Sequence, residues 1–307
     1  MVNLRQNHQK AGAGGFAIRS GVFLVILGLL YGVFQFLEGG NGSGQGTRIV
    51  INAPKSDNNS DSAEKSDEYM LHTTNLGYLV RHQYYALSYD EKDEQAEWVS
   101  YYISRNRLNH KRAERTNWFE KDPKVKTGSA TYKDYKGSGY DKGHLAAAAD
   151  MAFDKQAMED CFYMSNMSPQ VHNFNGGIWR ELEELTRDWG RMYDKVYVVT
   201  GPIFEHNLGV IGRQNKVTVP GAYYKIILDI EGKEKKAIGF VIPNEVSNKP
   251  LTAYIKSVDE IEEITGIDFF PELEDALEEK LEAKVNQAQW KFDNHLFRIR
   301  KEKWNLR

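Results

Sequence analysis

Between Gly21 and Leu37 the chain carries no charged side chain, and valine, leucine, isoleucine and phenylalanine dominate this run. The apolar stretch as a whole covers residues 16–37. A bilayer core about 30 Å thick requires roughly 20 apolar residues, with a lower limit near 17, so the stretch predicts a transmembrane anchor. A buried core helix, a cleaved signal peptide or a mitochondrial targeting segment would share parts of this pattern, but no small-x-small cleavage site directly follows the run.

The charges on either side of the apolar stretch predict its orientation. Arg5, Lys10 and Arg19 precede the uncharged run that begins at Gly21, and the first acidic residue of the chain is Glu38. This excess of positive charge predicts that residues 1–15 lie in the cytoplasm and that the chain after Glu38 lies on the outer side, periplasmic or extracellular. We therefore expect a single-pass membrane protein, with a mitochondrial membrane as the alternative location.

The composition changes twice after the anchor. Residues 38–68 are rich in glycine, serine, asparagine and aspartate, which predicts a flexible tether. We expect one folded domain over residues 69–270, because 41% of the chain is hydrophobic and this region is long enough to bury a core. Residues 271–307 are charged and helix-favouring, and they predict a helical C-terminal extension that either packs on the domain or projects from it.

Global composition excludes several classes of protein. A formal net charge of −3 excludes a basic protein of the histone type. The only cysteine, Cys161, has no partner for an internal disulfide. The chain also lacks the glycine motifs of Walker-type and dinucleotide-binding proteins.

The pattern of apolar residues predicts the elements of the domain. Aromatic and β-branched residues predict strands over residues 78–90, 97–104 and 194–204. The segment from Ala222 to Pro243 predicts a hairpin that turns at Glu231-Gly232. Ser257 has the chemistry of a helix N-cap, and the helix that follows is expected to end near Gly266.

The first motif with chemical potential is GYDKGHLAAAADM, from Gly139 to Met151. Its first residues are typical of a turn, and the alanines after His144 favour a helix. A histidine has a pKa near neutrality and is a suitable general base if it is held within reach of a water. The alternative is a hydrogen-bonded structural histidine, which is the commoner case for an isolated histidine.

The second motif runs from Ser165 to Gly190 and reads SNMSPQVHNFNGGIWRELEELTRDWG. Asn175 predicts the N-cap of a helix that continues to about Trp189. The large apolar residues of this helix recur at helical spacing and are expected to face the core: Trp179, Leu182, Leu185 and Trp189.

The same helix carries two polar residues on one side. Eight residues separate Asn175 from Glu183, which corresponds to about 12 Å of axial rise and about 80° of rotation. Both therefore cannot bind one ion directly, but Glu183 leans toward the N-terminus and could reach a water on an ion held by Asn175. A single amide oxygen with several waters suits Mg²⁺. A capped surface helix with a solvated Glu183 is the alternative.

A third segment, SRNRLNHKRAERTNW, concentrates positive charge. It contains one acid, Glu114, against five basic residues: Arg105, Arg107, Lys111, Arg112 and Arg115. Such a patch in a chain of negative net charge is suited to phosphate binding, although a solvated loop would have the same composition.

In their order and spacing these segments resemble the DNA/RNA non-specific endonuclease family, the endonuclease G-like ββα-metal (His-Me finger) nucleases. The family signature is Asp-Arg-Gly-His-x-x-Pro-x-x-Asp. Asp141, Gly143, His144 and Asp150 match it, whereas Lys142 stands in place of arginine and Ala147 in place of proline. The resemblance covers about residues 78–270, and it implies an α+β fold with a mainly antiparallel central sheet flanked by helices.

The resemblance also implies roles for individual residues. His144 resembles the general base, Asn175 the direct ligand of Mg²⁺ (with Mn²⁺ as a substitute), and Glu183 the residue that orders the metal's waters. Arg115 resembles a phosphate-binding arginine, and we expect Lys142 to assist it. The remaining assignments are looser: Asp141, Gly143 and Asp150 as structural residues of the site, and Arg105, Arg107, Lys111 and Arg112 as substrate-binding residues.

The expected function is hydrolysis of phosphodiester bonds in DNA and RNA, with products that carry 5′-phosphates by family resemblance. Contacts would be made to the backbone rather than to the bases, so sequence preference should be weak. The expected partners are DNA, RNA and the membrane, and a homodimer is left open. A catalytically inactive nucleic-acid-binding or membrane-scaffold protein on the same fold is the alternative, because Lys142 and Ala147 depart from the signature.

Overall fold

The computed structural model describes residues 69–306. The expected cytoplasmic N-terminus, anchor and tether, residues 1–15, 16–37 and 38–68, lie outside this range and stay predictions. Among the helices of residues 69–306, none is both long enough and apolar enough to cross a bilayer.

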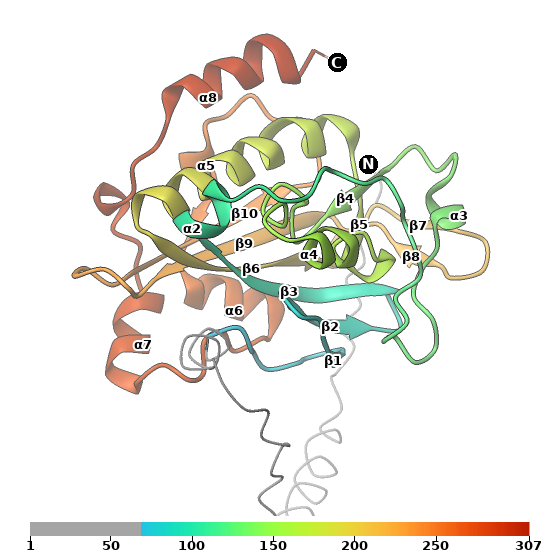
Figure 1. Ribbon diagram of the computed structural model, residues 1–307, viewed down its shortest axis with the longest axis horizontal. Helices are drawn as coiled ribbons and strands as arrows, with labels where there is room; N and C mark the ends of the chain where they lie inside the picture. Colours follow the sequence, from blue (N-terminus) through green and yellow to red (C-terminus); the bar gives the residue numbers. More distant parts are fainter. Residues whose placement is uncertain (1–68, 307) are drawn as a thin grey trace, which may run out of the picture. The chain divides into compact units, whose positions relative to one another are not determined.

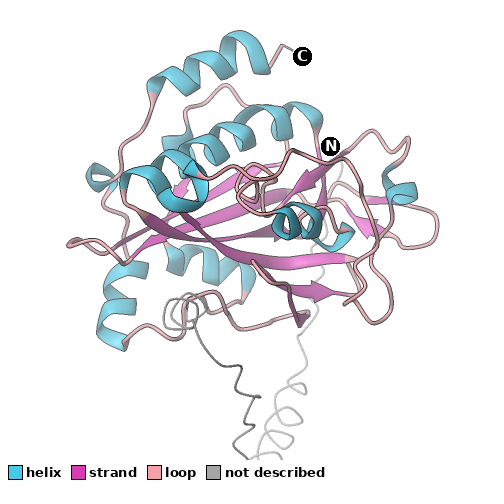
Figure 2. Cartoon of the chain, in the orientation of Figure 1, coloured by secondary structure: helices cyan, strands magenta, loops and turns pink. Residues whose placement is uncertain are grey.

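An antiparallel sheet of seven strands forms the centre of the described part (Figures 1 and 2). Its strands lie in the order β1 (Tyr78–Arg81), β2 (Ala86–Asp90), β3 (Gln95–Ser104), β6 (Lys195–Ile203), β9 (Ala222–Asp229), β10 (Lys236–Pro243) and β11 (Ile255–Lys256). Two further antiparallel pairs are β4 (Asp141–His144) with β5 (Met167–Gln170), and β7 (Val210–Ile211) with β8 (Val217–Thr218). The expected α+β fold with a central antiparallel sheet is confirmed.

Helices cover both faces of this sheet (Figure 2). One face packs against α4 (Lys155–Asp160), α5 (Arg180–Met192) and the β4–β5 pair, and the other against α6 (Val258–Thr265) and α7 (Asp275–Glu282). The shorter elements are α2 (Arg105–Asn109), α3 (Tyr132–Tyr135), η2 (Met164–Asn166), η3 (Phe174–Trp179), η4 (Leu251–Tyr254), η5 (Gln287–Gln289), α8 (Asn294–Ile299) and η6 (Arg300–Trp304).

Alternation along the strands divides the interior into two cores. On β9, Tyr223 and Ile227 pack with α5, whereas Ile226 and Leu228 pack with α6 and α7. Successive side chains of a strand point to opposite faces, so a central strand with apolar residues on both of its faces supplies both cores. Burial of each such side chain contributes about 1.5–3 kcal/mol, which holds the helices on both faces.

The apolar face of α5 lies where the sequence predicts it. Leu182, Leu185 and Trp189 are buried against the sheet, as is Trp179 just before the helix. The helix ends at Met192, a little beyond the predicted end near Trp189. This helix therefore holds its polar residues at a fixed height above the sheet.

Outside the two motifs of the candidate site, the strand and helix predictions hold with one correction. The hairpin of β9 and β10 and the strand β6 lie as predicted, and the strand predicted at residues 97–104 begins earlier as β3. Ser257 caps α6, and Gly266 ends it with a left-handed φ of 67°. The single strand predicted over residues 78–90 is wrong, because the chain turns at His82, whose amide donates to the carbonyl of Tyr85 (2.9 Å), and forms β1 and β2.

The C-terminal segment packs on the domain, which resolves the alternative left by its sequence. Helix α8 lies beside α5 (Figure 1), and Trp290 and Trp304 are buried. Arg300 is fully buried, where it pairs with Glu181 at the start of α5 and donates to the carbonyl of Lys249 (2.5 Å). The ion pair between Arg300 and Glu181 thus fixes the C-terminal segment to the start of α5, the helix that carries Glu183.

Candidate active site

His144 is the last residue of strand β4, where it pairs with Met167 of β5. The turn predicted immediately before it is wrong, because Asp141 to His144 form the strand itself. Gly143 is required at this place: a Cβ there would come within 2.0 Å of Oε1 of Gln170, whose side chain fills the space. Close pairing of β4 with β5 therefore fixes the position of the histidine.

The helix predicted directly after His144 is also wrong. Residues 145–153 form turns, and the next helix, α4, begins at Lys155. The side chain of Asn166 takes up the local backbone groups, since it accepts from the amide of Ala146 (2.8 Å) and donates to the carbonyl of Ala146 (3.0 Å). These bonds replace the ones that a helix would make, and the short side chains of the alanines allow this close approach.

His144 is held in an apolar and positively charged environment. It is 8% exposed, and its ring packs edge-on against Phe162 with 4.7 Å between the centroids. Burial, with additional effects from Arg115 and Lys142, lowers the pKa of His144 to about 3. The imidazole is therefore neutral near pH 7, and its Nε2 has no hydrogen-bond partner within the described residues. A neutral ring with a free nitrogen can accept a proton, and a base of such low pKa becomes stronger once an anionic substrate offsets the two cations.

Asn175 does not cap a regular helix, contrary to the prediction. It lies inside the π-helical turn η3, which precedes α5, and Gly177 in that turn has non-helical dihedral angles (φ −106°, ψ −108°). The amide Nδ2 of Asn175 donates to Oδ2 of Asp141 (2.9 Å), which is also 2.9 Å from Nδ1 of His172. Asp141 thus orients Asn175 from a strand rather than forming a turn.

A cavity of about 360 Å³ brings the main predicted residues together. It is lined by residues from β4, from η3 and α5, and from the loops before β4 and after it: Arg115, Lys142, His144, Ala147, Ala148, Ala149, Asn175, Gly176, Arg180, Glu183, Glu184 and Arg187. The cavity therefore places a neutral imidazole, an amide, carboxylates and cations around one space.

Glu183 is half-buried at this cavity rather than solvated. Burial raises the pKa of its carboxyl to about 7, and the positive charges of Arg187 and Lys225 partly oppose this rise. Arg187 is itself fixed by Asp150 (2.8 Å), and Asp150 also accepts from the hydroxyl of Tyr101 (2.8 Å). Asp150 therefore acts as an anchor beneath the site, in line with its expected structural place.

Lys225 is a residue near the site that the sequence analysis missed. It lies on β9, is buried, and its Nζ has no hydrogen-bond partner within residues 69–306. Burial lowers its pKa to about 8, while the charge of Glu183 acts in the opposite direction. The sequence does contain a signal that could have identified Lys225. It alternates with Tyr223 and Ile227 along the strand, so all three side chains point to the same face of the sheet, the one that α5 covers.

The five basic residues of the segment SRNRLNHKRAERTNW do not all lie at the cavity. Arg115 lines the cavity, but the four other basic residues expected to bind substrate do not: Arg105, Arg107, Lys111 and Arg112. Arg105 pairs with Asp194 (3.3 Å) and Lys111 with Glu114 (2.8 Å). The guanidinium of Arg107 stacks on the ring of Tyr102 at 3.5 Å, and Arg112 lies by a separate pocket beside Trp118.

The donor set of the cavity fits a hard divalent cation. Because Nδ2 of Asn175 is held by Asp141, its amide oxygen is the atom left for a ligand in the cavity. The carboxylate of Glu183 lines the same space, and no thiol or second imidazole does so among the described residues. Oxygen donors with room for water are typical of magnesium sites.

Comparisons with known proteins identify the family of the chain. The profile of the DNA/RNA non-specific endonuclease family matches residues 62–276. Human mitochondrial endonuclease G is 35% identical over 211 residues, which cover 64% of this chain and 71% of that protein. Nuclease C1 of Cunninghamella echinulata var. echinulata is 34% identical over 217 residues, which cover 64% of this chain and 84% of that protein.

A solved structure extends the comparison to three dimensions. The crystal structure of the EndoG/EndoGI complex, titled as showing the mechanism of EndoG inhibition, contains a chain with 29% sequence identity. The two align with a TM-score of 0.59 over 65% of this chain and 88% of that chain. The profile match spans well over half of the sequence, and the chain therefore belongs to the DNA/RNA non-specific endonuclease family.

Proposed function

We propose that the chain is a Mg²⁺-dependent nuclease that cuts phosphodiester bonds of both DNA and RNA at the cavity of His144. The observation that carries the proposal is the convergence of His144, Asn175 and Glu183 on one cavity, although they come from separate segments of the chain. A binding protein needs cations, but it does not need a neutral buried imidazole beside an oriented amide oxygen.

In this proposal His144 accepts the proton of the attacking water at Nε2. The neutral ring is ready to take a proton, and the nearby charges of Arg115 and Lys142 disfavour the imidazolium until a phosphate compensates them. Arg115 and Lys142 hold the substrate phosphate, and Arg115 can do so with two parallel hydrogen bonds. Asn175 would hold the metal through its amide oxygen, and Glu183 would order waters beside it.

The bound Mg²⁺ would stabilise the negative charge that develops on the phosphate and on the leaving 3′ oxygen. Glu183 is better able to act when its carboxyl is ionised, and Arg187 and Lys225 favour that form. Cleavage on the 3′ oxygen side would leave products with 5′-phosphates. The proposed contacts are made to phosphate rather than to base edges, so both nucleic acids are expected substrates.

The test is cleavage of supercoiled plasmid DNA and of a single-stranded RNA by the full chain, with Mg²⁺ or with chelator. We expect both polymers to be degraded with Mg²⁺ and both to stay intact with chelator, and end-labelling should detect 5′-phosphates. A metal-loaded chain that binds both polymers over a wide pH range but cuts neither would favour the inactive, nucleic-acid-binding alternative.

We further propose that residues 16–37 anchor the nuclease domain on the outer side of a membrane. The support is the charge bias of Arg5, Lys10 and Arg19 before an uncharged run. Protease added to spheroplasts should cut between residues 38 and 68 and release the domain. Full protection of the domain, with cutting only after lysis, would reverse the topology.

A further inference from the structure

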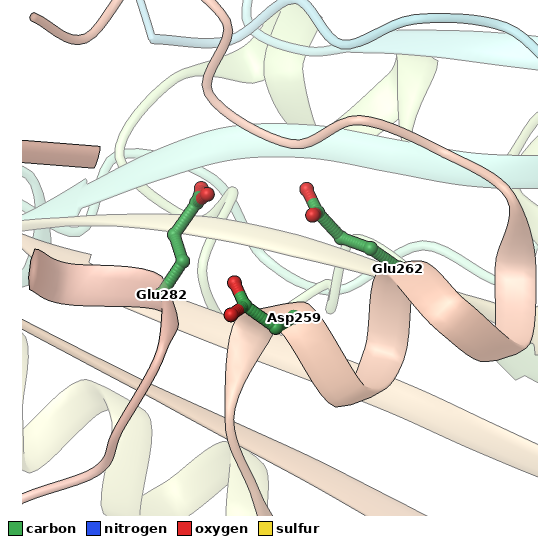
Figure 3. Close-up of side chains that lie close together, drawn as sticks. All are labelled: Asp259, Glu262 and Glu282. Atoms are coloured by element: carbon green, nitrogen blue, oxygen red, sulfur yellow. The ribbon is translucent and has the colours of Figure 1, made fainter. Parts of the chain in front are cut away.

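Three carboxylates converge between α6 and α7, on the face of the sheet opposite the cavity (Figure 3). Asp259 and Glu262 are three residues apart on α6, so their side chains lie on the same side of that helix. Glu282 is the last residue of α7, and its side chain points toward the same space. One oxygen atom from each carboxylate lies within 4.8 Å of the other two.

Glu282 lacks the partners that a buried carboxylate normally has. The residue is 5% exposed, and its Oε1 has no hydrogen-bond partner in the described part of the chain. Within residues 69–306, no ion pair involves any of the three carboxylates. Glu262 accepts from the amide of Phe269 through Oε1 (2.7 Å), which leaves its other oxygen for a ligand.

The local charges make this arrangement unfavourable without a positive partner. Burial and the negative charges of Glu262, Glu278 and Asp259 raise the pKa of Glu282 to about 9. Glu282 also lies at the C-terminus of α7, where the unpaired carbonyl groups of the helix carry partial negative charge. These carbonyl groups further disfavour a negative charge on Glu282. Buried carboxylates normally find a charged partner or a metal, so a cation would relieve all three effects.

The donor set and its position favour one kind of cation. Oxygens within 4.8 Å of one another fit around one Ca²⁺, which binds oxygen at about 2.3–2.6 Å in flexible geometry. Mg²⁺ demands near-ideal octahedral geometry and dehydrates reluctantly, so it is seldom held by a cage made of protein carboxylates alone. The set contains no nitrogen or sulfur donor, which disfavours zinc.

We propose that Asp259, Glu262 and Glu282 form a calcium-binding site that joins α6 to α7. The ion is held by one oxygen from each carboxylate and completes its coordination with water on the exposed side of Asp259. It links α6 to the end of α7, where the C-terminal segment begins its path across the domain. This site is separate from the catalytic cavity and goes beyond the proposed nuclease activity, since its role is to stabilise the fold.

The experiment measures thermal unfolding and Ca²⁺ binding by calorimetry on the full chain after removal of metals with chelator. An Asn175→Ala background removes the contribution of the catalytic cavity. With three carboxylate ligands we expect a Kd of about 10⁻⁵–10⁻³ M. At a Ca²⁺ concentration of about 100 times Kd, the midpoint of unfolding should rise by about 5–10 °C.

Matched variants on the same two helices assign this effect. Glu282→Gln should abolish the rise and the binding of one Ca²⁺, and Asp259→Asn, at an exposed position that the fold does not depend on, should weaken binding at least about tenfold. Glu279→Gln removes an exposed carboxylate from α7 and should leave binding unchanged. No Ca²⁺-dependent rise in the Asn175→Ala chain, or an equal rise in Glu282→Gln, would overturn the proposal.

Discussion

At the level of single residues, the cavity combines groups whose properties depend on their neighbours. His144 is neutral because it is buried beside two cations, and Asn175 presents its oxygen because Asp141 holds its nitrogen. The same residues in a solvated loop would have neither property. Substitutions that keep the fold but change one neighbour are therefore informative about the chemistry.

The first prediction compares the residues assigned to the metal. Asn175→Ala removes the proposed direct ligand of the metal, so activity should fall, and raising Mg²⁺ should recover part of it. Glu183→Gln should cost less, since in our proposal Glu183 acts through water. Initial rates of plasmid cleavage across a Mg²⁺ titration test this. If Glu183→Gln is the more damaging change, the direct ligand and the water-ordering residue are interchanged.

The second prediction concerns Lys142, which stands where the family signature has arginine. Its ammonium lies 4.8 Å from the ring centroid of Tyr132 and 4.9 Å from that of Phe119, at the edge of the cavity. If it holds a phosphate, Lys142→Ala should lower activity and reduce the salt slope of nucleic-acid binding by about one unit. Lys142→Arg should match or exceed the parent, because a guanidinium can grip phosphate with two bonds.

Cleavage and binding at several salt concentrations measure both effects of Lys142. Lys111→Ala is the matched control, because Lys111 lies outside the cavity and pairs with Glu114. An unchanged rate and slope in Lys142→Ala would remove Lys142 from the site and leave the phosphate to Arg115.

At the level of secondary-structure elements, the sequence predicted regular structure well and its irregularities poorly. The apolar periodicity of α5 and the caps of α6 are local signals, and both were confirmed. The π-helical turn at Asn175 was missed because it depends on the backbone of the two glycines that follow. Gly177 adopts non-helical dihedral angles there, and a residue without a side chain gives no apolar pattern that would predict them. The helix predicted after His144 does not start at Ala146, because the side chain of Asn166, 20 residues further along the chain, binds both the amide and the carbonyl of Ala146.

Long-range pairs were beyond the reach of the sequence for a similar reason. Glu181 and Arg300 are 119 residues apart in the chain, and each has the ordinary appearance of a solvated helix residue. Lys225 is likewise a single lysine within a mainly apolar strand. Its relation to the site becomes visible only in the fold, where it faces α5 and its charge acts on Glu183. By contrast, that His144, Asn175 and Glu183 line one cavity could be predicted, because family-like motifs surround them.

The third prediction tests the contact between the C-terminal segment and α5. Arg300→Met leaves the carboxylate of Glu181 buried and unpaired, so the free energy of unfolding should fall by about 3–5 kcal/mol. Because Glu181 begins the helix of Glu183, activity should fall as well. Denaturant unfolding measures the first effect. Arg298→Met, at an exposed position, is the control and should be nearly neutral.

A double variant separates loss of the pair from loss of packing around Arg300. Glu181→Leu combined with Arg300→Met removes both charges, and it should recover most of the stability lost in Arg300→Met. A double variant as unstable as the single one would mean that the charge pair itself is not what holds the segment.

For the molecule as a whole, the sheet separates the proposed chemistry from a second, structural face. The cavity lies on the α5 face, whereas α6, α7 and the segment from Tyr69 pack on the other. His72 belongs to this second face, where Nε2 is 3.0 Å from Oγ of Ser100 and Nδ1 accepts from the amide of Phe270 (3.1 Å). Burial lowers the pKa of His72 to about 3.

The fourth prediction follows from the two buried histidines. Their folded pKa values lie below the unfolded value near 6.5, so the unfolded chain binds protons first as the pH falls. The contribution of these two histidines to stability is therefore complete above about pH 6.5 and declines toward pH 3. His72→Asn should remove about 1 kcal/mol per pH unit from this slope between pH 6 and 5. Equal slopes in the parent and the variant, from denaturant unfolding, would contradict it.

The measurement that bears most directly on the catalytic cavity is single-turnover cleavage by His144→Ala, with nucleic-acid binding measured in parallel. A general base typically contributes about 10²–10⁴-fold, so we predict a loss of that size on both DNA and RNA, with binding and unfolding close to those of the parent. A His144→Ala chain that binds normally and cuts within threefold of the parent would show that another group activates the water.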